Sequence, residues 1–198
     1  MKGSLIIVGF FVVGIAVGLY FPHFGVPSSL SYYSLCALMF CVGVGIGCDT
    51  KVLRSFKNIN PRLMLLPLMT IMGTLAGTAA ASALLPGRSL SDCLAVGSGF
   101  GYYSLSSIFI TEYRGAELGT IALLANIMRE IVTLLCAPLL ARHFGKLAPI
   151  SMGGATSMDT TLPIITRVSG HDFVIVSIFH GFCVDFSVPF LVTFFCSL

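Results

Sequence analysis

The sequence has few charges, and it lacks the motifs that mark common catalytic centres. Only 10% of its 198 residues are Asp, Glu, Lys or Arg, against roughly 25% in soluble domains. It contains no H-E-x-x-H, no G-x-S-x-G and no Walker-type G-x-x-x-x-G-K-[ST] motif, so neither a hydrolase nor an ATP-driven pump is indicated. The seven cysteines form no C-x-x-C pair and resemble small buried hydrophobic residues. We therefore expect no enzyme, no cofactor and no metal site.

Apolar residues dominate instead. They make up 56% of the chain, and the mean hydropathy is +0.98. The apolar runs are about twenty residues long, which is the length that a helix needs to cross a bilayer. The net charge is only +3, and the basic residues flank the apolar runs, so nucleic-acid binding is not expected. The composition predicts an all-α integral membrane protein in contact with the lipid bilayer.

Five runs are predicted to be full transmembrane helices within a single domain, 1–198. The first begins near the N-terminus and is read as a span and not as a cleaved signal, because no A-x-A-like site follows it. The five runs are residues 4–21, 30–48, 63–85, 117–140 and 173–195.

Two further segments, 91–111 and 148–170, are apolar but interrupted. The first contains GSGFGYYSLSS (97–107), and the second contains GGATSMDTTLP (153–163). Irregular backbone at membrane depth is tolerated only where protein buries it or where it lines a water-filled cavity. We expect two re-entrant or broken segments, as in many carriers, although 91–111 could also be a full span.

The distribution of basic residues favours the re-entrant alternative. With five full spans and two re-entrant segments, the N-terminus lies inside and the C-terminus outside, and eight of the eleven basic residues are cytoplasmic, as the positive-inside rule requires. These eight are Lys2, Lys51, Arg54, Lys57, Arg62, Arg142, Lys146 and Arg167.

Asp159 is the leading candidate for a functional residue, because carboxylates are rare within membrane proteins and usually mark functional sites. It could bind a cationic substrate or carry a proton. The alternative is a helix cap, with a helix beginning at Thr160. Thr156 and Ser157 belong to the same segment.

A second polar group lies in the span 117–140. Asn126 and Glu130 share a helix face, with Arg129 beside them. They could line the pathway, with Glu130 as a second proton site. Alternatively, Arg129 could form a structural ion pair with Glu130 or Asp159.

Hydroxyls and aromatic rings in the other broken segment could bind an ammonium group, or they could serve helix packing. The candidates are Tyr102, Ser104 and Ser106. In the last span Asp185 and His180 could titrate, but His180 is better explained as a hydrogen-bonded packing residue.

Together these motifs resemble the C-terminal part of the lysine exporter LysO family. The residues that carry the resemblance are GSGFGYYSLSSIFITE up to Glu112, the cluster Asn126-x-x-Arg129-Glu130, GGATSMDTTLP and His180-Gly181-Phe182. The resemblance implies an inner-membrane carrier that exports L-lysine and toxic analogues such as thialysine, with proton entry as the driving force. It also implies that Asp159 matches an acidic residue that the family needs for export.

The resemblance further implies a partner. Family members carry an additional N-terminal hydrophobic region with a second acidic residue, so we expect a small membrane protein to supply that half, or a homo-oligomer. The alternative functions are a channel or ion-coupled carrier for another small solute, and a membrane scaffold that does not transport.

Overall fold

The computed structural model describes residues 62–85 and 87–198, together with a few isolated positions between 13 and 44. The spans predicted at 4–21 and 30–48 therefore fall almost entirely outside the described residues. The chain divides into two units, Met1–Thr50 and Lys51–Leu198, and the description below concerns the second. The expectation of a single domain stays a prediction.

The described part of Lys51–Leu198 is built from helices, with no strand in residues 62–85 and 87–198. The order is η2 (Leu63–Leu65), α4 (Leu66–Ser82), α5 (Leu90–Gly97), α6 (Tyr103–Arg114), α7 (Ala116–Phe144), α8 (Ala148–Gly153), η3 (Gly154–Met158), α9 (Leu162–Ser169), η4 (His171–Phe173) and α10 (Val174–Ser197).

Three of the described helical stretches are long and apolar enough to cross a membrane: Leu63–Ser82, Ala116–Phe144 and His171–Ser197. They match the spans predicted at 63–85, 117–140 and 173–195. Two of them contain an interior proline, Pro138 and Pro189, which neighbouring helices and hydroxyl groups make tolerable in membrane helices. The sequence prediction of these spans is confirmed.

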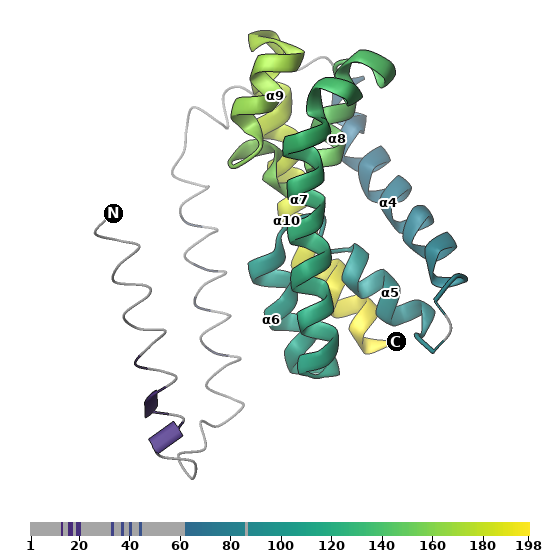
Figure 1. Ribbon diagram of the computed structural model, residues 1–198, viewed down its shortest axis with the longest axis vertical. Helices are drawn as coiled ribbons and strands as arrows, with labels where there is room; N and C mark the ends of the chain where they lie inside the picture. The colour runs from purple at the N-terminus through teal and green to yellow at the C-terminus, as the bar shows by residue number, and fades with distance from the viewer. Residues whose placement is uncertain are drawn as a thin grey trace. The chain divides into compact units, whose positions relative to one another are not determined.

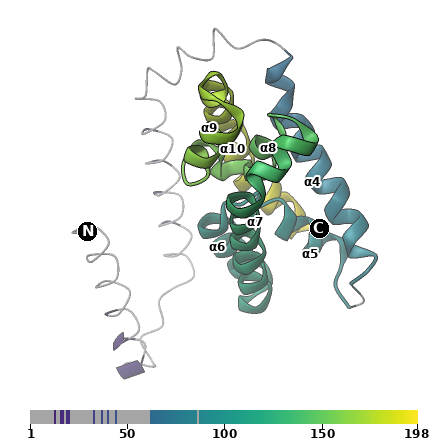
Figure 2. The ribbon, with the colours of Figure 1, turned by 45° about the horizontal axis from the view of Figure 1, so that its top comes forward.

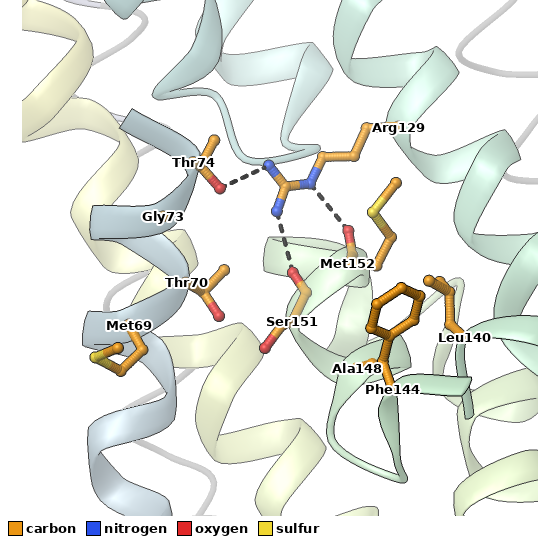
Figure 3. A pocket seen from close by; sticks show the side chains of 10 residues that line it. All are labelled: Met69, Thr70, Gly73, Thr74, Arg129, Leu140, Phe144, Ala148, Ser151 and Met152. Carbon is orange, nitrogen blue, oxygen red and sulfur yellow. Dashed lines mark hydrogen bonds between the residues drawn. The ribbon is translucent and has the colours of Figure 1, made fainter. Parts of the chain in front are cut away.

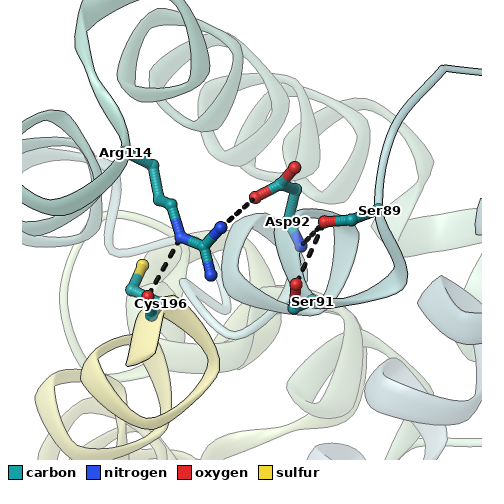
Figure 4. Close-up of polar contacts among 5 residues, drawn as sticks. All are labelled: Ser89, Ser91, Asp92, Arg114 and Cys196. Atoms are coloured by element: carbon teal, nitrogen blue, oxygen red, sulfur yellow. Dashed lines mark hydrogen bonds and ion pairs between the residues drawn. The ribbon is translucent and has the colours of Figure 1, made fainter. Parts of the chain in front are cut away.

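The segment 90–114 is a helical hairpin, which we call the first hairpin. Helix α5 leads to a non-helical tip at 98–102, and α6 leads back. The two ends meet, because the Arg114 guanidinium lies 3.5 Å from the Asp92 carboxylate and donates to the Cys196 carbonyl at the end of α10 (Figure 4). Arg88, just before the hairpin, pairs with Glu117 just after it. A continuous helix of this length would separate its ends by more than 30 Å, roughly.

The segment 148–169 forms a second hairpin from α8, η3 and α9, with η3 (Gly154–Met158) at its tip. Its ends also meet, since Ser169 Oγ donates to the Lys146 carbonyl over 2.7 Å. Ile150 and Ile165 from its two arms pack with Val176 of α10 in a small apolar core. The base of this hairpin therefore lies where α7 ends and α10 begins.

The two hairpins enter the bundle from opposite ends. The first has its base at the start of α7 and the end of α10, and the second has its base at the other ends of these same helices. In Figure 1, α5 and α6 lie at one end of α7, and α8 and α9 lie at the other. The view in Figure 2 agrees. Both broken segments predicted from the sequence are thus broken helices, and their tips point toward each other.

Candidate functional site

The tips of the two hairpins are in backbone contact halfway along α7. Ala155 N–H donates to the Phe100 carbonyl over 3.0 Å. Gly154 has φ +61°, and a Cβ there would overlap the same carbonyl oxygen. On the opposite tip, Gly101 has φ +95° and a Cβ would come within 3.3 Å of the Gly153 carbonyl. Only glycine fits such conformations without strain, so the glycines allow the two tips to meet.

Asn126 of α7 holds the first tip. Its side chain is 3% exposed. The amide oxygen accepts from Gly101 N–H over 2.8 Å, and the amide nitrogen donates to the Val96 and Ala122 carbonyls. A broken helix leaves backbone donors and acceptors without helical partners, and Asn126 supplies both kinds of partner.

Arg129, one turn further along α7, holds the second tip. Its guanidinium donates to the Met152 carbonyl over 2.9 Å and the Ser151 carbonyl over 3.1 Å, at the end of α8. It also donates to Thr74 Oγ1 of α4 over 3.3 Å, and it lies over the ring of Phe100 at 5.9 Å. The structural ion pair considered from the sequence does not form with either Glu130 or Asp159. Carbonyl dipoles at a helix end take the place of a carboxylate.

Hydroxyl groups attach the second tip to α10. Ser157 Oγ donates to the Ser177 carbonyl, and Ser177 Oγ donates to the Ser157 carbonyl. His180 is fully buried, with Nδ1 3.0 Å from Ser157 Oγ and Nε2 2.9 Å from Thr70 Oγ1 of α4. His180 is therefore a hydrogen-bonded packing residue, as expected. Its partners, Ser157 and Thr70, were not predictable from the sequence.

Asp159 follows the second tip directly and is exposed. Its carboxylate accepts from the Thr160 backbone N–H. The helix-cap alternative is wrong as stated, because α9 begins at Leu162 and its N-cap, Thr161, makes no side-chain capping bond. The Asp159 carboxylate is within electrostatic range of Asp185 of α10 and of Tyr102 of the first tip.

The other predicted site residues occupy different surroundings. Ser106 and Thr156 are buried and bond to the Tyr102 and Gly153 carbonyls within their own hairpins. Ser104 is exposed. Glu130 is half-buried and forms no ion pair with a described residue, although it follows Arg129 directly. The structure brings Asn126, Arg129, Tyr102 and the second tip together, but it does not bring Ser104 or Glu130 into this network.

Two cavities flank Arg129 between α4 and α7. The larger, about 540 Å³, is lined by Met69, Thr70, Gly73, Thr74, Arg129, Leu140, Phe144, Ala148, Ser151 and Met152 (Figure 3). The smaller, about 350 Å³, extends the other way along α4 past Gly77 and Asn126. Arg129 and Thr74 line both cavities. The cavity-lining face of α4 was not predictable from the sequence, because small residues there indicate packing as readily as a pathway.

Long apolar helices, two broken hairpins of opposite direction and cavities at the level of their tips define a helical integral membrane protein of the transporter type. The comparisons with known proteins agree. The sequence profile of the family "Lysine exporter LysO" matches residues 8–196, so the chain belongs to this family.

Two curated relatives support the assignment. The chain is 34% identical over 196 residues to "Lysine exporter LysO" of Escherichia coli K12, a match that covers 97% of the chain and 64% of that relative. It is 32% identical over 189 residues to a "Putative lysine exporter" of Haemophilus influenzae, with 94% of each covered. The chain thus spans slightly less than two thirds of the length of the E. coli relative. No solved structure matches the chain.

Proposed function

We propose that this chain takes part in the export of L-lysine across the bacterial inner membrane. The observation that carries the proposal is Asp159, an exposed carboxylate at the point where a broken helix meets its counterpart. An exposed carboxylate suits the ammonium group of a cationic amino acid. The family and the names of both relatives support lysine as the substrate.

Proton entry is the proposed driving force. A carboxylate in a membrane protein is neutral with a proton bound and negative when it binds a cation, so one group can exchange the two. Asp159 is the proposed exchanging group. Thialysine, which keeps the charged groups of lysine, is proposed as a second substrate.

The proposed topology places the base of the second hairpin in the cytoplasm and that of the first outside. Arg142, Lys146 and Arg167 all lie at the second base, and this supports a cytoplasmic position under the positive-inside rule. Both hairpins are then re-entrant, the N-terminus is cytoplasmic and the C-terminus is periplasmic.

A partner is also proposed. The E. coli relative extends beyond the matched region, since only 64% of it is covered. Additional helices from a small membrane protein, or a second copy of this chain, would complete the transport path in this proposal.

Lysine efflux and thialysine resistance in an exporter-deficient bacterium test the proposal. The chain is expressed alone and with the candidate partner, as wild type, Asp159→Asn and Asp172→Asn. Asp172 is an exposed carboxylate in η4 and is the matched control. We expect efflux from the wild type and from Asp172→Asn, and loss of efflux from Asp159→Asn.

Other outcomes would favour the alternatives. Full activity of Asp159→Asn would end the proposed mechanism. Efflux that survives collapse of the proton gradient would favour a channel or a carrier coupled to another ion. Absence of lysine efflux under every condition would leave a membrane scaffold or a carrier for another solute.

A further inference from the structure

We propose that Arg129, at the inner end of the larger cavity, binds the carboxylate of the transported amino acid. This inference deepens the proposed function and rests on it. It adds a second recognition point to the Asp159 carboxylate, and it assigns the α4–α7–α8 cavity as the place where the substrate's negative group enters.

The size of the cavity suits an amino acid. Its volume of about 540 Å³ falls within the roughly 300–1,000 Å³ of small-molecule sites. It begins at Phe144, the end of α7, and Ala148, the start of α8, and it reaches Arg129. Fifteen residues of helix separate Phe144 from Arg129, or about 22 Å, so the cavity leads from one end of the bundle to the level of the hairpin tips.

The charge of the cavity lining favours a negative group. Among the described residues that line the cavity, Arg129 is the only charged one, and the others are apolar residues, a glycine or hydroxyl-bearing residues. No described carboxylate forms an ion pair with Arg129. The Arg129 charge repels an ammonium group at this point of the cavity, whereas a carboxylate group meets an arginine that has no carboxylate partner among the described residues.

The guanidinium has unused donors and a fixed orientation. Arginine carries five N–H groups, and three are used for the Ser151 carbonyl, the Met152 carbonyl and Thr74. The remaining N–H on each terminal nitrogen has no acceptor among the described residues. Because the three existing bonds and the Phe100 ring hold the group in place, little conformational entropy is lost when a carboxylate binds.

A structural role is the competing explanation, since the same bonds tie α7 to α8 and α4. The two explanations differ in which ligands they discriminate. If Arg129 has only a structural role, its substitution changes the affinity for every ligand equally. If Arg129 binds the carboxylate, its substitution changes the affinity only for ligands that carry a carboxylate.

Competition binding with purified full-length protein separates these explanations. Radiolabelled lysine is displaced by unlabelled lysine, by lysinamide or by cadaverine, which lacks the carboxylate. In the wild type we expect the two analogues to compete at least about tenfold less well, since hydrogen bonds to charged groups are the stronger ones. In Arg129→Gln the affinity for lysine should fall by a similar factor while the affinity for cadaverine stays unchanged.

Matched variants complete the design. Arg142→Gln removes an exposed charge from the same helix and should leave all affinities unchanged. Arg129→Lys keeps the positive charge but loses the paired N–H donors of the planar guanidinium. It should therefore retain part of the preference for lysine. Gly73 and Gly77 lie one turn apart on α4, and a Cβ at either position would meet no atom within 4 Å. Gly73 lines the larger cavity and Gly77 lines the smaller one. Each is replaced by leucine. Only Gly73→Leu should weaken lysine binding.

Each contrary result would overturn the inference. If lysine and lysinamide compete equally well in the wild type, the inference fails, and this result does not depend on the folding of any variant. The inference also fails if Arg129→Gln loses lysine binding and cadaverine binding to the same extent. Selective loss in Gly77→Leu would refute the assignment to the larger cavity. If the wild type binds other α-amino acids but not lysine, the proposed substrate fails and the carboxylate site stands.

Discussion

Replacement of Gly154 by alanine should separate the two hairpin tips. Gly154 combines φ +61° with ψ −128°, and an alanine in such a region costs about 1–3 kcal/mol. Its methyl group would also overlap the Phe100 carbonyl oxygen. To relieve the overlap the tips must move apart, and the Ala155 N–H loses its 3.0 Å bond to that oxygen. A buried donor without a partner costs roughly another 1–3 kcal/mol, so the total is about 2–6 kcal/mol.

The matched control is Gly145→Ala. Gly145 also has a positive φ, +89°, but a Cβ there would meet no atom within 4 Å. Gly145→Ala should therefore lose only the stability that an alanine at positive φ costs. Thermal melting in detergent, followed by circular dichroism, measures both variants, and lysine efflux at matched expression levels measures function. We expect Gly154→Ala to melt at a clearly lower temperature than Gly145→Ala and to lose efflux. If the two variants melt alike and both export, contact between the tips does not stabilise this protein.

Three further predictions concern the same architecture. Asn126→Ala leaves the buried Gly101 N–H without its acceptor, so we expect destabilisation of about 1–3 kcal/mol in the same melting assay. An Asn126→Ala variant that melts like the wild type would contradict this role. Gly181→Val should detach the second tip from α10, because a Cβ there already comes within 2.7 Å of Met158 Cβ. We expect loss of efflux, and a fully active variant would contradict the packing. Finally, single cysteines at Arg88 and Glu117, in a background without the native cysteines, should react with an impermeant maleimide from the same side of the membrane. Lys146→Cys should react from the other side, and labelling of the first two from opposite sides would refute the re-entrant first hairpin.

Much of the fold was predictable from local sequence patterns. The spans at 63–85, 117–140 and 173–195 follow from the length of their apolar runs, and each corresponds to a long helix within a few residues. The interruptions near Gly101 and Gly154 were also predictable, because adjacent glycines and hydroxyl-bearing residues weaken a helix at the position where they stand. These features depend on neighbours in the chain, so the sequence contains them directly.

The direction of the first broken segment was not predictable in the same way. Charge counting favoured a hairpin over a full span at 91–111, but counting does not detect which residues touch. The pairs Arg88–Glu117 and Arg114–Asp92 bring the two ends together. Each pair joins residues more than twenty positions apart, and nothing in the local pattern specifies the partner.

The sequence by itself therefore determined the membrane class, the described long helices, the two broken segments and the family. The tertiary structure decided what the polar residues do. Arg129 is bound by the carbonyls of Ser151 and Met152 and not by a carboxylate, while Asp159 is exposed and no helix cap. The physical reason is that every residue has a backbone carbonyl, so a partner of that kind leaves no trace in the sequence. Only the meeting of two distant helix ends shows which carbonyls face the guanidinium.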